Sequence, residues 1–271
     1  MTADPVPTLR WREAATSEPP ALVLLDQTQL PVDEILLECV DVEAVAEAIE
    51  SLRVRGAPAI GVAAAYGAAI GAWHARGSGH LVEGVSAAIE RLARTRPTAV
   101  NLKWSLDAMR EAVRKVGHNA RVEVAYAEAA RLCDEDVETC RRIGENGLRI
   151  IRGLAEAKPG ETVNILTHCN AGWLATVDKG TALAPVYRAH DSGIPVHVWV
   201  DETRPRNQGA SLTAWELGKH GITANAVQAG VTPTRALTKI TQDWEEWVEK
   251  TKVRNPMQRT TTPEDIANTI S

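Results

Sequence analysis

The sequence contains no run of about 18 uninterrupted apolar residues, which is the minimum for a helix that spans a membrane. Its N-terminal segment, MTADPVPTLRWREA, lacks the apolar core of a secretion signal. The sequence as a whole also lacks an excess of basic side chains, because its formal net charge is −5. A general nucleic-acid or membrane-surface binder needs a basic face. We therefore expect no transmembrane helix, no nucleic-acid partner and no membrane partner.

Cysteine is scarce, and its spacing excludes a disulfide scaffold. The four cysteines, Cys39, Cys133, Cys140 and Cys169, form neither a CxxC motif nor a disulfide framework. We therefore expect a reducing compartment, the cytoplasm. Cys133 and Cys140 fall roughly on one face of a predicted helix. Because no further candidate ligands lie near them, packing is their expected role and no metal site is predicted.

The first half of the chain is a series of helical patterns. At 271 residues, the sequence has room for one large domain or two smaller ones. The segment PAIGVAAAYGAAIGAWHA is almost entirely small and apolar, which predicts a helix that is buried on most sides. Helical patterns end at Lys158-Pro159-Gly160, and a β-α-β pattern follows. The patterns before that point predict a strand at 21–25 and helices at 42–52, 58–75, 82–94 and 122–154.

An arginine precedes a proline at the start of two predicted helices. Arg55 lies just before Gly56-Ala57-Pro58, and Arg96 lies just before Pro97. The N-terminus of a helix offers free N–H groups to an anion, and a guanidinium binds phosphate in a fixed bidentate geometry. The pair predicts a phosphate site. The alternative for Arg55 is a solvated charge at a helix boundary.

The second half is organised around residues 164–208. Two apolar runs, 163–166 and 196–200, flank a helical pattern from about Gly180 to Ser192. Each run ends in a polar cluster, at 167–172 and 201–208. In an open α/β sheet, ligands bind at the carboxyl ends of the strands. Both clusters are therefore expected to line one crevice.

Cys169 is the candidate catalytic thiol of that crevice. It directly follows a predicted strand, in a loop rich in N–H donors, which stabilise a thiolate. The alternative is a buried structural cysteine. His168 is not predicted to be its partner, because neighbouring side chains on an extended chain point to opposite sides.

Carboxylates and an amide follow the second predicted strand. One side chain of the pair Asp201-Glu202 should point into the crevice, or both acids pair with Arg204 and Arg206 instead. Gln208 opens a predicted helix from Gly209 to Gly221, where its amide can donate to an anion.

These motifs resemble the methylthioribose-1-phosphate isomerase family, which is related to the α, β and δ subunits of translation initiation factor 2B. They occur in the order that the family has. The matching segments are Leu24–Pro31, Val54–Gly67, Arg96–Met109, Ile165–Pro185 and Val200–Leu217.

The resemblance implies an α/β fold, with a mainly helical N-terminal domain and a short β start at residues 1–158, and a Rossmann-like parallel-sheet domain at 159–271. It implies a homodimer and an aldose–ketose isomerisation of 5-methylthioribose 1-phosphate to 5-methylthioribulose 1-phosphate, in methionine salvage, without cofactor or metal. Cys169 takes the position of the family's catalytic thiol. The residues at the family's substrate-phosphate positions are Arg55, Gly56, Ala57, Arg96 and Gln208.

The chain departs from the family after Ile222. The family's segment with the catalytic aspartate and an Asn-Lys pair is replaced, and the fold is expected to be truncated relative to the family. If the last residues are laid on that segment, Gln258-Arg259 replaces Asp-Arg, while Asp265 matches a later aspartate and Asn268 keeps the substrate-binding asparagine. A shortened parallel sheet leaves an apolar face and an edge, to be covered by the tail or by a partner chain. The candidate acids are Asp201, Glu202 and Asp265.

Two other functions are compatible with the sequence. One is an isomerase for another pentose 1-phosphate. The other is a non-catalytic regulatory protein that binds a sugar phosphate or a nucleotide, as the relatives of the initiation-factor type suggest.

Overall fold

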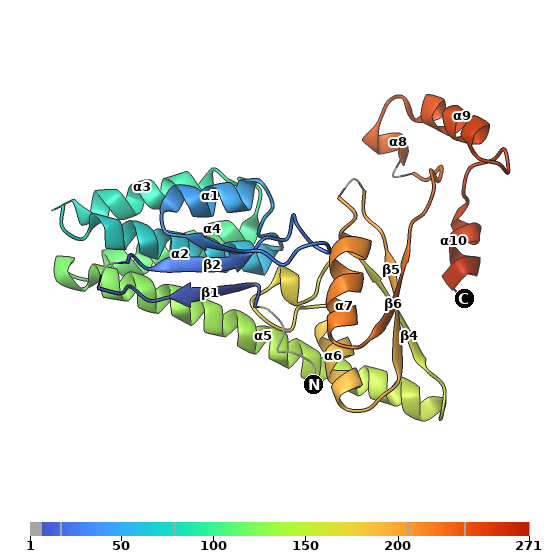
Figure 1. The fold of residues 1–271 in the computed structure, drawn as a ribbon, viewed down its shortest axis with the longest axis horizontal. Coiled ribbons are helices and arrows are strands. Elements are labelled where there is room, and N and C mark those ends of the chain that lie inside the picture. Colours follow the sequence, from blue (N-terminus) through green and yellow to red (C-terminus); the bar gives the residue numbers. More distant parts are fainter. Residues whose placement is uncertain (1–6, 17, 79, 205, 236, 271) are drawn as a thin grey trace.

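The structure is a computed structural model that describes residues 7–16, 18–78, 80–204, 206–235 and 237–270 (Figure 1). It has a helical first part and a second part built on a parallel sheet, so the predicted α/β fold class is confirmed. The first part contains β1 (Leu9–Arg12), β2 (Ala21–Leu25), β3 (Leu36–Cys39), α1 (Val42–Glu50), α2 (Ala57–Ala75), α3 (Leu81–Ala93), α4 (Val100–Arg114), a 3₁₀ turn at His118–Ala120 and α5 (Arg121–Ala157). The second part contains β4 (Val163–His168), a 3₁₀ turn at Trp173–Ala175, α6 (Ala184–Asp191), β5 (Val196–Asp201), a π-helical segment at Gly209–Ala214, α7 (Trp215–Lys219), β6 (Thr223–Val227), α8 (Leu237–Ile240), α9 (Trp244–Arg254) and α10 (Pro263–Ile270).

Helix α2 is the centre of the first core. Its small residues allow α1, α3, α4 and α5 to pack around it, and nearly the whole helix is buried. Pro58 lies in the first turn, where its missing N–H leaves no hydrogen bond unmade. A methyl group added at Gly71 would lie 2.5 Å from Cβ of Ala88, so only glycine permits this helix contact. The antiparallel sheet β1-β2-β3 covers another side, with the buried strand β2 at its centre.

Helix α5 belongs to both cores. Its N-terminal half buries Ala125, Ala129 and Leu132 in the core around α2, and its C-terminal half packs against α6. There Gly147 lies against the ring of Pro185. The predicted domain boundary near residue 158 therefore stays a prediction: α5 ends at Ala157, but a single helix joins the two parts.

The second part is a parallel sheet in the order β4-β5-β6. Val196, Val198 and Val200 of β5 are buried on the face that α6 and α7 cover. The opposite face is open, and Leu166 on it is 55% exposed. On that face the His197 ring hydrogen-bonds to side-chain oxygens on both neighbouring strands. The tail helices lie by the carboxyl ends of the strands (Figure 1). Glu202 and residues of α10 line one pocket there, and Leu166 on the open face stays exposed.

The helix predicted from Gly180 to Ser192 begins later than expected, at Ala184. The preceding residues are held by a different set of hydrogen bonds, because the amides of Thr181 and Leu183 both donate to the carbonyl of Ala171. Gly180 has a φ of +77° and packs on the backbone of Gly172. A compact loop therefore replaces the first predicted helical turn. Among the described residues, no helix is long and apolar enough to cross a membrane.

Candidate functional site

The start of α2 is pressed against the turn that follows Cys169. Gly56 has a φ of +95°, and a methyl group added there would lie 2.3 Å from the carbonyl oxygen of Ala175. Both the backbone conformation and the close approach require glycine. Buried Val54 anchors the preceding loop. The sequence RVRGAP therefore fixes Arg55 at the contact between the two parts of the protein.

Arg55 links α2, through Asn170, to residues 169–175, which we call the cysteine turn. Its Nη1 donates to Oδ1 of Asn170 at 2.8 Å, and its Nη2 donates to the Asn170 carbonyl at 3.0 Å. Asn170 is 6% exposed, and its Nδ2 donates to Oγ1 of Thr213 at 3.1 Å. The Thr213 hydroxyl in turn donates to the carbonyl of Cys169 at 2.6 Å. One continuous network thus runs from Arg55 to the backbone of Cys169.

Cys169 lies in a tight turn at the carboxyl end of β4. Its amide donates to the carbonyl of Asp201 at 3.1 Å, which extends the pairing of β4 with β5. Its φ is +59°, a left-handed conformation that is uncommon for residues other than glycine and is often found at functional sites. The side chain of His168 is 66% exposed and faces Asp201, with 4.0 Å between Nδ1 and Oδ2. The two neighbours are therefore not arranged as a dyad.

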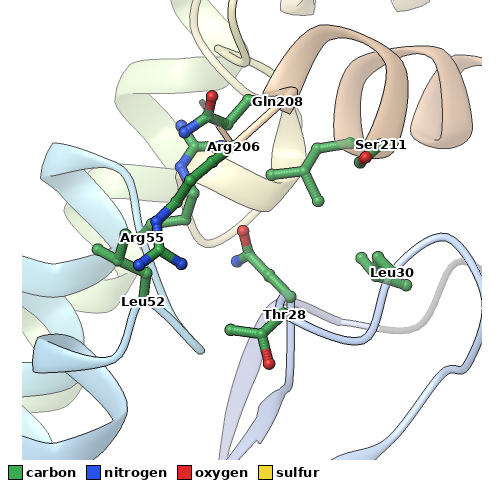
Figure 2. A pocket seen from close by; sticks show the side chains of 9 residues that line it. Thr28, Leu30, Leu52, Arg55, Arg206, Gln208 and Ser211 are labelled. Atoms are coloured by element: carbon green, nitrogen blue, oxygen red, sulfur yellow. The ribbon is translucent and has the colours of Figure 1, made fainter. Parts of the chain in front are cut away.

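A pocket of about 260 Å³ lies between the loop after β2 and the loop after β5. Figure 2 shows Arg55, Arg206 and Gln208 together on one side of it, across from Leu30. Oε1 of Gln208 accepts a hydrogen bond from the Thr203 hydroxyl, which leaves its Nε2 as a donor. The pocket is lined by Gln27, Thr28, Leu30, Leu52, Arg55, Arg206, Gln208, Ser211 and Leu212. Two guanidinium groups and an amide donor form a suitable site for an anion.

The structure brings together part of the predicted phosphate set. Arg55 and Gln208 line the pocket, whereas Gly56 and Ala57 lie at the start of α2 and do not line it. Burial lowers the pKa of Arg55, and the nearby positive charge of Arg96 lowers it further. Arg96 is therefore close enough to act on Arg55 without lining the pocket. The roles of these residues in phosphate binding stay predictions.

The three candidate acids have other partners. Asp201 faces His168. The Glu202 carboxylate accepts hydrogen bonds from the amides of Thr203, Gly209 and Ala210, each at 2.7 Å, so it holds the start of the π-helical segment. Among the described residues, neither acid forms an ion pair with Arg204 or Arg206, the alternative that the sequence left open.

The tail candidates lie on α10. Asp265 is paired with Arg259 and accepts from the Thr262 amide, and these contacts hold the pKa of the Asp265 carboxyl well below its ordinary value. Asn268 is exposed on the same helix. Neither residue lines the pocket, and their participation stays a prediction.

Sequence reasoning missed Glu216, a carboxylic acid that is buried against the cysteine turn. The residue is 0% exposed, and its Oε2 accepts from the amide of Leu174 at 3.1 Å. Burial raises the pKa of Glu216 to about 8. The available signal was a single acid flanked by two apolar residues, Trp215 and Leu217.

Gln27 was also missed. It lines the pocket, and its Nε2 donates to the carbonyl of Leu174 at 2.7 Å, which ties the first sheet to the cysteine turn. Gln27 belongs to the motif at Leu24–Pro31, but it was not singled out. Among the described residues, no group of three His, Cys, Asp or Glu side chains is placed to hold a metal ion.

Comparison with known proteins identifies relatives for most of the chain. Methylthioribose-1-phosphate isomerase from Rhodospirillum centenum is 58% identical over 199 residues, which are 73% of this chain and 52% of that protein. The enzyme of the same name from Escherichia coli O45:K1 is 53% identical over 203 residues, covering 74% of this chain and 53% of that protein. The chain thus spans about half the length of the curated relatives that it matches.

Two solved structures share the fold. The 5-methylthioribose 1-phosphate isomerase from Pyrococcus horikoshii superposes with a TM-score of 0.72 at 35% identity, over 83% of this chain and 61% of that chain. The delta subunit of translation initiation factor eIF-2B from A. fulgidus gives a TM-score of 0.70 at 36% identity, over 92% of this chain and 65% of that chain.

Two family models match different parts of the sequence. The model of the Enoyl-(Acyl carrier protein) reductase family matches residues 208–271. This range includes the tail after Ile222, where the chain departs from the isomerase motifs. The model of the Initiation factor 2 subunit family matches residues 53–229, more than half of the chain, and this range contains Arg55, Cys169 and Gln208. The resemblance predicted from the sequence is confirmed, and the chain belongs to the Initiation factor 2 subunit family.

Proposed function

We propose that this chain is an aldose–ketose isomerase that converts 5-methylthioribose 1-phosphate to 5-methylthioribulose 1-phosphate. The observation that carries the proposal is the network in which Arg55, at the anion pocket, is bonded to Asn170 beside Cys169. A sugar phosphate held at Arg55 would lie near Cys169, the residue that follows β4 and whose carbonyl is joined to Arg55 through Thr213 and Asn170. The isomerases that match this chain at more than half identity support the choice of substrate.

The reaction rearranges hydrogen atoms within one molecule. C2 loses its hydrogen and the proton of its hydroxyl to become a carbonyl, C1 gains a hydrogen, and the opened ring oxygen becomes a hydroxyl. No atom is gained or lost, so the overall conversion is an internal redox reaction. In the proposed roles, Arg55, Arg206 and Gln208 hold the phosphate, and Cys169 transfers a proton at the carbon centre. Asp201 is the candidate acid that ends the strand next to Cys169.

The first prediction is therefore catalytic activity that depends on Cys169. Purified chain incubated with 5-methylthioribose 1-phosphate should form the ketose, measured by proton NMR. Cys169→Ser should lower kcat by a factor of at least ~100, because a hydroxyl is a much weaker proton donor than a thiol. Cys133→Ser is the matched control, since Cys133 lies on α5 away from the pocket and should keep full activity. An inactive wild-type chain would refute the proposal.

A second candidate function is binding without turnover. The segment after residue 207 also matches a reductase family, and the chain spans about half of its isomerase relatives. A protein that retained Arg55 and Gln208 and lacked an acid partner for Cys169 would bind the sugar phosphate and leave it unchanged. Measurable binding, no ketose, and equal affinity in Cys169→Ser would select this function.

We also propose that the chain acts as a homodimer in the cytoplasm. The support is the family resemblance for the dimer and the scattered cysteines for the reducing compartment. Sedimentation equilibrium of the purified chain tests the dimer directly, since a single species at the monomer mass would exclude it.

A further inference from the structure

Glu216 is a completely enclosed carboxylic acid that the proposed reaction does not use. Its Oε2 accepts from the amide of Leu174, and Gly172 packs directly on Oε1. A methyl group added at Gly172 would lie 1.4 Å from Oε1, so no other residue type fits there. The acid is therefore built into the turn that carries Cys169.

Arg55 is the charge that acts on this acid. Burial raises the pKa of Glu216 to about 8, while the hydrogen bond from the Leu174 amide and the charge of Arg55 oppose that rise. Among the described residues, Oε1 of Glu216 has no hydrogen-bond partner. Tyr187, on α6, is the other titratable group against it, and burial raises the pKa of Tyr187 far above its ordinary value. At neutral pH, Glu216 is protonated and Tyr187 is neutral, so the charge of Arg55 is not neutralised from the interior.

Arg55 and this acid contact the same turn, Arg55 at Asn170 and Glu216 at Gly172. Both of its Nη atoms are held by Asn170, and its side chain also lines the anion pocket. An ionised Glu216 would place a negative charge against the turn that holds Arg55, in an interior where little water screens it. That charge would repel an anion in the pocket and would compete with it for Arg55.

We propose that Glu216 is a positioning residue whose protonated form leaves the charge of Arg55 available to an anionic ligand, and whose ionisation weakens anion binding. The inference rests on the proposed function only in that the pocket binds a phosphate group. By linkage, an anion bound at Arg55 favours the protonated form of Glu216 in turn.

Inorganic sulfate is the probe, because it keeps the same charge over the whole pH range of the experiment. The protein is the full chain with Cys169→Ser, which replaces the nearby thiol with a neutral hydroxyl. Isothermal titration calorimetry at constant ionic strength measures the Kd of sulfate. We expect the Kd to rise about tenfold between about pH 7 and about pH 9.5 as one buried charge forms near the site. In Cys169→Ser/Glu216→Gln, the Kd should stay flat over that range.

Two further measurements separate this effect from general damage. Glutamine has the size of glutamate and can still accept from Leu174, so Glu216→Gln should show the wild-type circular dichroism spectrum. Cys169→Ser/Tyr187→Phe should keep the pH dependence, because Tyr187 does not titrate in this range.

Three results would overturn the inference: an equal rise of the Kd with pH in the Glu216→Gln variant, a flat profile in the Tyr187→Phe variant, or no sulfate binding at about pH 7. The outcome is separable from the isomerase activity. Sulfate binding with the expected pH profile and no turnover would refute the proposed function alone. Turnover with sulfate binding that ignores pH would refute the role of Glu216 alone.

Discussion

Burial shifts the pKa values of Arg55, which lines the pocket, and of the enclosed Glu216 in opposite directions. It lowers the pKa of Arg55 and raises that of Glu216, because each charged form loses its contact with water. A guanidinium still remains charged at neutral pH, whereas Glu216, with a pKa of about 8, holds its proton. A buried carboxylate without a close cationic partner is costly. The stability of the fold should therefore depend on the proton at Glu216.

The second prediction concerns this dependence. Between the ordinary pKa of 4.5 and the folded value of about 8, the folded state holds a proton that the unfolded state releases. The free energy of unfolding should fall as pH rises through this window, by at most about 1.4 kcal/mol per pH unit from this group. Glu216→Gln removes the contribution, so urea denaturation should show the variant gaining stability relative to wild type from about pH 5 to about pH 8. A constant difference would contradict the buried, protonated state.

At the scale of single residues, the sequence predicted those that have a local signature. Arg55 precedes a helix that has proline in its first turn, and Gln208 precedes a helix, so local rules place both at helix starts. Glu216 has no such signature, because its burial depends on Gly172 and Leu174, which are more than 40 residues away in the chain. The partners of Glu202 are likewise set by the path of the loop after β5.

At the scale of elements, α5 determines how the two parts are held together. Gly144 and Gly147 face α6, and a methyl group added at Gly147 would lie 2.3 Å from Cγ of Pro185. Gly153, six residues further along the helix, has open space at the same position. Gly147 and Gly153 therefore lie on the same helix and differ in what packs against them.

This difference gives the third prediction. Gly147→Ala should destabilise the protein by ~1–3 kcal/mol, because it forces α6 away from α5. Gly153→Ala should stabilise it by ~0.5–1 kcal/mol through better helix propensity. Urea denaturation of both variants checks the signs. A stabilised Gly147→Ala variant would mean that the packing of α5 on α6 is looser than described.

The boundaries of elements were predictable where turn residues or a proline bound an apolar run. Strand β2 has the predicted bounds, and α2 begins one residue before the predicted Pro58. The predicted start of α6 was one turn too early. The amides of Thr181 and Leu183 donate to the carbonyl of Ala171 and do not form a helical turn. That choice depends on the close packing of Gly180 on Gly172, which no local pattern reveals.

At the scale of the whole molecule, the residue ranges that match the two family models overlap at β6. The Initiation factor 2 subunit model extends to residue 229, and the reductase model begins at 208, so both include the strand from Thr223 to Val227. Before that strand, the relatives' motifs and the site geometry agree. After it, α8, α9 and α10 leave Leu166 exposed on the open face of the sheet. The sequence located this departure after Ile222, but local patterns could not place the tail in space.

The central claim is that a sugar phosphate binds beside Cys169, and alkylation of the thiol tests it whether or not the chain turns over. Iodoacetamide modification of each cysteine is followed by mass spectrometry, with and without 5-methylthioribose 1-phosphate. At about ten times its Kd, the ligand should slow alkylation of Cys169 about tenfold, in proportion to the unoccupied fraction. The rate at Cys133 on α5 should not change. Equal rates at Cys169 with and without ligand would contradict the account.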